Sequence, residues 1–252
     1  MKNFTLVILA LFCTAIVTAE ISPIEKQALV DLYNSTNGDK WTNSWDLNED
    51  PTNWKGVTIF RDRVFALSLK DNNLTGTIPA SLSNLTGLKI LNLHKNNLLG
   101  TIPASLGTIK GLKTINLSLN KLEGNIPNEI MAMASLEYLD LYFNNLSGEL
   151  EDNLAGLKNL KRLSLANNNF RGNLPAAITT LQKLTELQLS SNSFTGRLPK
   201  DLASLSQLKK LNLFDNNFTG EFPSKLNSLN LDELTYNDNN FTETATLLAA
   251  GE

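Results

Sequence analysis

The chain has 252 residues, of which 42% are hydrophobic, so it is long enough for one or two domains with a buried core. Its 22 basic and 25 acidic residues give a formal net charge of -3, which argues against a nucleic acid as partner. One histidine and one cysteine are too few for the usual metal-ligand clusters or nucleophilic triads.

Residues 1–19 have the pattern of a secretory signal. Lys2 precedes an uncharged, mostly apolar run, and small residues follow at Thr18 and Ala19. We expect cleavage after Ala19, which would also remove Cys13 and leave an exported, secreted or cell-surface chain without disulfides. The alternative is an uncleaved membrane anchor, for which the apolar run is short. No later segment is apolar enough to cross a membrane, so we expect no membrane insertion of the mature chain.

Residues 20–60 are predicted to form an N-terminal helical cap. The segment 25–33 has a helical pattern that places four apolar or aromatic residues on one face: Ala28, Leu29, Leu32 and Tyr33. Pro23 marks the start of this helix, and Asn37-Gly38 marks its end. Three tryptophans follow within a short stretch: Trp41, Trp45 and Trp54. They could form a ligand platform, but the first coil of a repeat stack exposes an apolar face, and large aromatics are suited to cover it.

Residues 61–243 carry a sequence frame that repeats every 24 residues. Glycine recurs at 76, 100, 124, 148, 172, 196 and 220, and an asparagine lies four positions before each one. Proline follows at 79, 103, 127, 175, 199 and 223, with Glu151 as the one exception. An eighth copy is one residue shorter and ends at Asn239. A sustained period of this length predicts a solenoid of about eight coils.

Each part of the frame has a structural reason. Alternating leucines such as Leu91 and Leu93 predict a short strand with both side chains inward, and stacked strands predict a parallel sheet. The asparagine is expected to hydrogen-bond to backbone groups of its own turn and of the next coil. Glycine allows a tight backbone path, and proline fixes φ in the outer half of the coil.

These residues resemble the 24-residue plant-type class of the leucine-rich repeat superfamily, LxxLxxLxLxxNxLxGxIPxxLxx, and 88–106 fits it nearly position for position. The resemblance implies an α/β-type repeat solenoid, a right-handed superhelix with a concave parallel β-sheet and an irregular or 3-10 convex side. Segments 28–38 and 54–57 also resemble the N-terminal cap of this class. That cap usually carries a disulfide, but Thr52 and Ile59 stand where its cysteines would be expected.

Enzymatic signals are nearly absent, so we predict no catalytic residues, no cofactor and no metal. The single His94 is predicted on the exposed strand face, as a surface residue or a pH-sensitive contact. The glycines that recur every 24 residues belong to the frame, and the sequence contains no glycine-rich phosphate loop. Lysines at 89, 113, 161 and 209 line one margin of the sheet, interrupted by Glu137 and Thr185, as a weak basic stripe or a solvated edge.

The residues that flank the inward leucines are expected on the concave face, because side chains alternate along a strand. The central coils place there an aromatic group with a charged rim, and this composition is typical of a protein-binding hot spot. The predicted binding residues are Tyr138, Asp140, Tyr142, Phe143, Arg162, Glu186 and Phe214. The alternative is that these aromatics only pack on one another across neighbouring coils.

The leading hypothesis is an exported, non-catalytic protein that binds another protein or a peptide through the concave face. By resemblance the ligand could be a peptide, a receptor ectodomain or a secreted hydrolase that the protein inhibits. Two alternatives are a structural or adhesion component of the cell surface and a glycan-binding module. The tail 244–252 could cover the last coil or leave it open for self-association.

Overall fold

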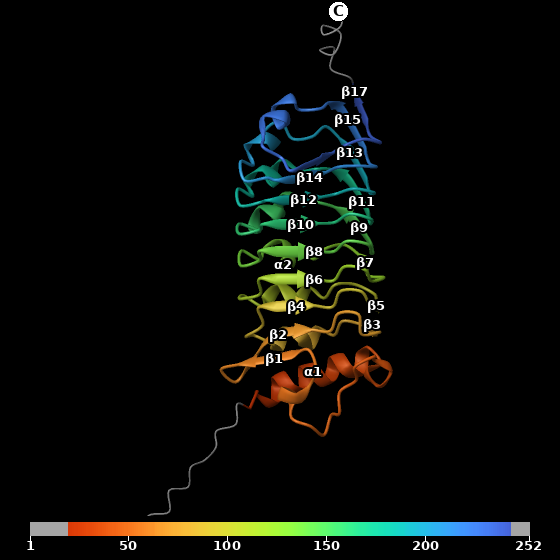
Figure 1. Cartoon of the computed structure of the whole chain (residues 1–252), viewed down its shortest axis with the longest axis vertical. Helices are drawn as coiled ribbons and strands as arrows, with labels where there is room; N and C mark the ends of the chain where they lie inside the picture. The colour runs from red at the N-terminus through yellow and green to blue at the C-terminus, as the bar shows by residue number, and fades with distance from the viewer. Residues whose placement is uncertain (1–19, 243–252) are drawn as a thin grey trace, which may run out of the picture.

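The computed structural model describes residues 20–242, which form a stack of parallel coils (Figure 1). The expected signal segment at 1–19 and the tail from 243 onward lie outside the described residues. One side of the stack is a nine-stranded sheet in the order β1-β2-β4-β6-β8-β10-β12-β14-β16. Its strands are β1 (Val57–Phe60), β2 (Arg63–Ser68), β4 (Ile90–Asn92), β6 (Thr114–Asn116), β8 (Tyr138–Asp140), β10 (Arg162–Ser164), β12 (Glu186–Gln188), β14 (Lys210–Asn212) and β16 (Glu233–Thr235).

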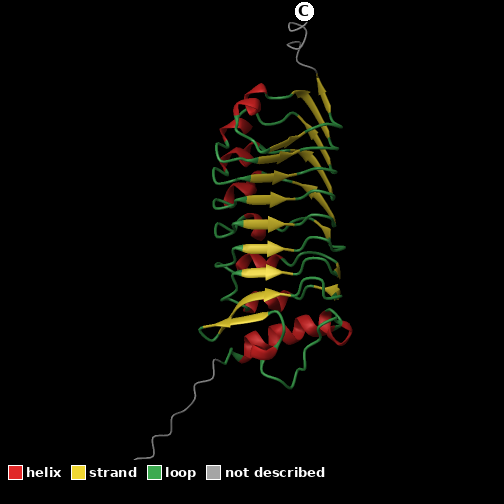
Figure 2. Cartoon of the chain, viewed as in Figure 1, coloured by secondary structure: helices red, strands yellow, loops and turns green. Residues whose placement is uncertain are grey.

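A second set of short parallel strands follows each turn. It comprises β3 (Thr75–Thr77) with β5 (Asn97–Leu99), and a six-stranded sheet of β7 (Glu123–Gly124), β9 (Asn145–Glu149), β11 (Asn169–Asn173), β13 (Ser193–Gly196), β15 (Asn217–Glu221) and β17 (Asn240–Thr242). The opposite side of the coils carries 3-10 turns η3 (Ala80–Asn84), η4 (Ala104–Thr108), η5 (Asp152–Gly156), η6 (Ala176–Thr180), η7 (Leu202–Ser204) and η8 (Ser224–Ser228), and the one-turn helix α2 (Asn128–Met131) (Figure 2). The predicted repeat solenoid is confirmed.

The register of the nine-stranded sheet follows the repeat period. Leu139 of β8 pairs with Ile115 of β6 and Leu163 of β10, so residues 24 apart lie side by side. Leu139 and Leu141 are fully buried, whereas Tyr138 on the same strand is exposed. The alternation predicted from the sequence is therefore correct. We call the outer surface of this sheet the sheet face; it is the surface predicted to be concave.

The asparagine of each coil forms a buried hydrogen-bonded ladder. Asn144 accepts from the backbone N–H of Leu122 at 3.0 Å and donates to the carbonyl oxygens of Leu117 and Leu141 at 3.0 and 3.1 Å. Leu117 and Leu122 belong to the preceding coil. The sequence predicts side-chain bonds to the next coil, and this part of the prediction is wrong. The ladder satisfies backbone groups at the point where the chain leaves the sheet and turns.

A stack of phenylalanines replaces leucine at one core position of the C-terminal coils. The rings of Phe170, Phe194 and Phe218 lie nearly parallel, with centroids 6.2 and 6.0 Å apart, and Phe241 continues the stack at 6.2 Å. The first three are fully buried. Offset-stacked aromatic pairs add to the stability that burial alone supplies, so these coils are tied together by more than leucine packing.

The N-terminal end is closed by α1 (Pro23–Ser35), which begins after Ser22 and is followed by η1 (Gly38–Lys40) and η2 (Pro51–Asn53). The three tryptophans are only 2–5% exposed. Trp45 stacks on Trp54 at 4.8 Å and meets Trp41 edge-on at 4.9 Å. Each indole N–H donates to a backbone carbonyl: that of Thr36, Lys55 or Asp46. The tryptophans are core residues of this end and do not form a ligand platform.

Candidate protein-binding surface

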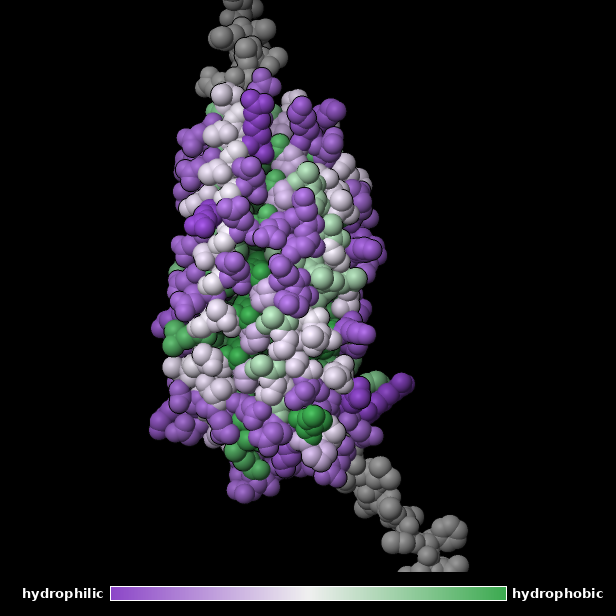
Figure 3. All heavy atoms as spheres, turned by 180° about the vertical axis from the view of Figure 1, so that it is seen from behind, coloured by the Kyte–Doolittle hydropathy of each residue, from purple (hydrophilic) through white to green (hydrophobic). Residues whose placement is uncertain are grey.

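The sheet face carries exposed aromatic side chains only in certain coils. Tyr138, Tyr142, Phe143 and Phe214 have 41%, 37%, 53% and 36% of their surface exposed. None of them belongs to the repeated frame, so the fold does not require an aromatic residue at these positions. The face opposite the nine-stranded sheet is mostly hydrophilic or neutral, with hydrophobic side chains in small groups (Figure 3). Because the fold does not require them, the exposed aromatics of the sheet face are candidates for binding.

Tyr138 and Arg162 lie next to each other in register on β8 and β10. The ammonium group of Lys161 lies 5.9 Å from the centre of the Tyr138 ring, within the range of a cation–π contact. Arg162 donates from Nε to Oε2 of Glu186 at 2.7 Å, which pairs the two predicted charges on neighbouring strands. Tyr138, Arg162 and Glu186 thus form one continuous row across three strands.

Tyr142 and Phe143 follow β8 at the point where the chain turns. Their ring centroids are 5.8 Å apart, in a tilted arrangement. Phe143 has φ of 54°, in the left-handed region, and the equivalent residue of every other coil has φ between 51° and 55°. A bulky residue is unusual in this conformation, because its side chain crowds the backbone. The turn would be satisfied better by the asparagine found one coil later at Asn167, so the frame gives no reason for a phenylalanine here.

Phe214 is separate from the other aromatics. It is three coils from Tyr142, roughly 14 Å at the usual spacing of strands. The intervening positions hold the small, buried Ala166 and Ser190. Among Tyr138, Tyr142, Phe143 and Phe214, only Tyr142 and Phe143 form a ring–ring contact with each other. The alternative that they exist to pack on one another therefore does not account for Tyr138 or Phe214.

Asp140 is half-buried between Tyr138 and Tyr142. Its Oδ1 accepts from the backbone N–H of Tyr142 at 3.2 Å. Burial raises the pKa of the Asp140 carboxyl above its usual range, although the hydrogen bond from Tyr142 and the charge of Arg162 act in the opposite direction. All seven predicted binding residues lie on the sheet face or at its turn edge, and six of them are in the three adjacent coils of β8, β10 and β12.

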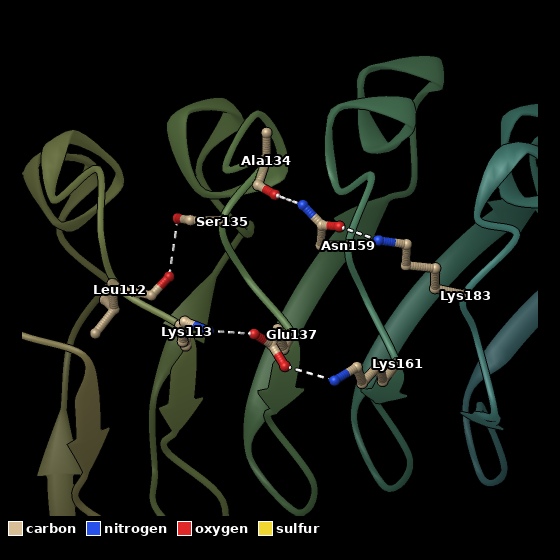
Figure 4. A network of polar contacts seen from close by, with 8 residues as sticks. All are labelled: Leu112, Lys113, Ala134, Ser135, Glu137, Asn159, Lys161 and Lys183. Carbon is tan, nitrogen blue, oxygen red and sulfur yellow. Dashed lines mark hydrogen bonds and ion pairs between the residues drawn. The ribbon is translucent and has the colours of Figure 1, made fainter.

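The predicted lysine stripe is neutralised at its centre. Glu137 accepts from Lys113 and from Lys161, both at 2.7 Å (Figure 4). One carboxylate thus links the preceding coil and the following coil to its own. The same margin holds a ladder in which Lys183 donates to Asn159 and Asn159 donates to the carbonyl of Ala134. This margin is a hydrogen-bonded edge of the stack rather than a basic stripe.

Glu137 is expected to make stability depend on pH below about 4.5. The hydrogen bonds from Lys113 and then Lys161 lower its pKa from 4.5 to about 2. Because the folded pKa is depressed, the stabilisation is present above pH 4.5 and is lost as the pH falls toward 2. Between these values, the melting temperature of the Glu137→Gln variant should fall less steeply than that of the wild type. Glu123→Gln, at an exposed glutamate, is the control; equal slopes for wild type and Glu137→Gln would contradict the prediction.

A polar chain on the sheet face was not foreseen from the sequence. The Ser118 hydroxyl donates to Oδ1 of Asn116 at 2.6 Å, and that oxygen also accepts from the Ser118 backbone N–H. Because this uses the hydroxyl proton, Nδ1 of His94 must be the donor in its 2.7 Å contact with Ser118 Oγ. The 24-residue spacing of His94 and Ser118 was the available signal. His94 is half-buried within this chain rather than a free surface residue.

Within residues 20–242, no cluster of three or more histidine, cysteine or acidic side chains is arranged to hold a metal ion. The same range contains no helix with the length and apolar character needed to cross a membrane. A cavity of about 740 Å³ lies near the C-terminal end and is lined by charges of both signs, among them Arg197, Lys200 and Glu221. None of the residues that line it is a predicted binding residue.

The leucine rich repeat family model matches residues 86–146 and 158–218, and a second leucine rich repeat model matches residues 64–85. The chain belongs to the leucine-rich repeat superfamily, in its plant-type class. A probable leucine-rich repeat receptor-like protein kinase of Arabidopsis thaliana is 37% identical over 71 residues, which cover 28% of this chain and 10% of the kinase.

Two solved structures are similar to this chain in fold. The structure of PEPR1–AtPEP1 is 32% identical, with a TM-score of 0.79, and the match covers 86% of this leucine-rich repeat chain and 32% of that one. The plant peptide hormone receptor RGFR1 in complex with RGF2 is also 32% identical, with a TM-score of 0.68, over 69% and 28% of the two chains. The chain thus spans about a third or less of the length of these relatives.

Proposed function

We propose that this leucine-rich repeat protein is an exported, non-catalytic recognition protein that binds a peptide or an extended segment of another protein through the sheet face. The observation that carries the proposal is the set of exposed aromatics at positions where the repeat frame requires none. Exposed aromatic side chains on a rigid sheet lose little conformational entropy on binding and are enriched in hot spots. The similar structure of RGFR1 with RGF2 is that of a plant peptide hormone receptor, which supports the choice of ligand class.

The proposed site extends along the coils rather than into a closed pocket. Tyr138 with Arg162 and Glu186 marks one side, and Tyr142 with Phe143 marks the turn side. The small residues Ala166 and Ser190 separate this group from Phe214. An extended chain lying across the strands could contact both aromatic groups at once, with its side chains over the small residues between them.

We expect replacement of the central aromatics to abolish partner capture. The full-length protein would be immobilised and exposed to material secreted by its source, in parallel with the triple variant Tyr138→Ala, Tyr142→Ala and Phe143→Ala. A hot-spot residue contributes about 2 kcal/mol or more, so the affinity for a captured partner should fall at least about 30-fold. Circular dichroism would verify that the fold is retained.

Leu99→Ala provides the matched control, because Leu99 is an exposed apolar residue on β5, away from the sheet face. Capture that survives in the triple variant, or that is lost equally in the control, would contradict the proposal. Concentration-dependent assembly without any partner would indicate a structural or adhesion component instead. Binding to a polysaccharide array would indicate a glycan-binding module.

A further inference from the structure

Asp140 carries the only charge in its column of the sheet face. The column runs through the residue between the two inward leucines of each coil, and its other members are neutral: Ser68, Asn92, Asn116, Ser164, Gln188, Asn212 and Thr235. The exception occurs in the same coil as Tyr138, Tyr142 and Phe143. Charge and aromatic character therefore depart from the repeat together.

The backbone does not need this charge. In other coils the side-chain oxygen of an asparagine accepts from the N–H two residues on, at 3.1 Å for Asn92, 3.0 Å for Asn116 and 3.0 Å for Asn212. Asp140 makes the same bond at 3.2 Å with one of its two oxygens. A neutral asparagine amide would accept the same backbone hydrogen bond, so the fold does not require an ionised carboxylate at position 140.

The charge also has no ionic partner within the described chain. The ion pairs found among residues 20–242 do not include Asp140, and Arg162 on the neighbouring strand donates to Glu186 instead. A half-buried carboxylate without an ion pair is unfavourable, because the hydrogen bond from Tyr142 replaces only part of the hydration that burial removes. Its raised pKa has the same cause. Such a group is expected where an outside ligand supplies the missing cation.

The surroundings of Asp140 are suited to a cation with an apolar stem. Tyr138 and Tyr142 lie two residues away on either side along the same face of the strand, roughly 7 Å from it. Their rings can take the flat face or the stem of a basic side chain. On the next coil the aligned residues Ser164 and Ala166 are small and buried, so they leave the approach to Asp140 open.

We infer that Asp140, flanked by Tyr138 and Tyr142, is the binding site for a basic side chain, arginine or lysine, of the partner polypeptide. This inference rests on the proposed function and specifies the ligand of the same surface. The carboxylate accepts the charged hydrogen bonds, and the two tyrosine rings cover the stem. The Arg162–Glu186 pair next to it is neutral as a unit and does not repel the incoming cation.

The test is selection of binders from a random peptide library on the full-length protein, followed by affinity measurement on variants. We expect the selected peptides to share an arginine or lysine at one position. Asp140→Asn keeps the backbone hydrogen bond and should weaken these peptides by about tenfold or more. Replacing the shared residue by citrulline or norleucine should weaken binding to the wild type by a similar factor and leave binding to Asp140→Asn almost unchanged.

Asp215→Asn is the matched control, because it removes the same charge from an exposed aspartate beside Phe214 and should leave affinity nearly unchanged. Thermal unfolding of Asp140→Asn at pH 7 should occur at the same temperature as the wild type or higher, which excludes misfolding as the cause. Peptides that lack a basic residue, or that bind Asp140→Asn as tightly as the wild type, would overturn the inference.

The two proposals fail in different ways. If the selected peptides are lost in the triple aromatic variant but retained by Asp140→Asn, the surface binds peptides and only the basic anchor is wrong. If the peptides are indifferent to the triple variant, or none is selected, the proposed function is wrong and the inference falls with it.

Discussion

Leu139→Ala is expected to lower the free energy of unfolding by about 2–5 kcal/mol, the range typical of buried leucines. Leu139 is fully buried in β8, in the middle of the stack. It pairs in register with Ile115 and Leu163, so its truncation leaves a cavity between three coils. Because each coil of a solenoid is stabilised mainly by its neighbours, a central cavity weakens two coil interfaces at once. Urea denaturation followed by circular dichroism would measure the change.

The adjacent Tyr138 supplies the control for this prediction. It lies on the same strand but points outward, so Tyr138→Ala should change the free energy of unfolding by no more than about 0.5 kcal/mol. The contrast between neighbours tests the register directly. A large loss for Tyr138→Ala together with a negligible loss for Leu139→Ala would mean that the strand faces the other way.

Asn144→Ala is expected to destabilise the protein by about 1–3 kcal/mol, the cost of leaving a buried hydrogen-bonding group unsatisfied. The Leu122 N–H donates to Asn144 Oδ1 and would lose this acceptor. The carbonyls are less affected, since Leu117 O also accepts from Asn120 and Leu141 O also accepts from Asn168. Each of these carbonyls therefore accepts from two asparagines, whereas the Leu122 N–H has Asn144 as its one acceptor.

Two further variants sharpen this test. Asn144→Asp retains an acceptor for Leu122 but places an acceptor-only carboxylate against the carbonyls of Leu117 and Leu141, so at pH 7 it should be at least as destabilising as alanine. Asn145→Ala changes the exposed neighbour and should have little effect. If Asn144→Ala and Asn145→Ala gave the same melting temperature, the ladder would not contribute to stability.

The sequence by itself determined the architecture. A 24-residue period places residue i beside residue i+24 in the stack, so the inward leucines and the aligned rows such as Tyr138, Arg162 and Glu186 could be predicted. The same arithmetic identified the asparagines and the departure of the coil that contains Tyr142 and Phe143. Periodicity carries this information because every coil repeats the same backbone path and the same burial pattern.

Only the tertiary structure decided how the side chains that do not recur contact one another. It shows that Glu137 bridges two lysines and that Asp140 has no ionic partner among the described residues. These contacts depend on side-chain rotamers and on which of two nearby partners a charge selects, as Arg162 selects Glu186. A repeat frame does not fix such choices, because they differ from coil to coil.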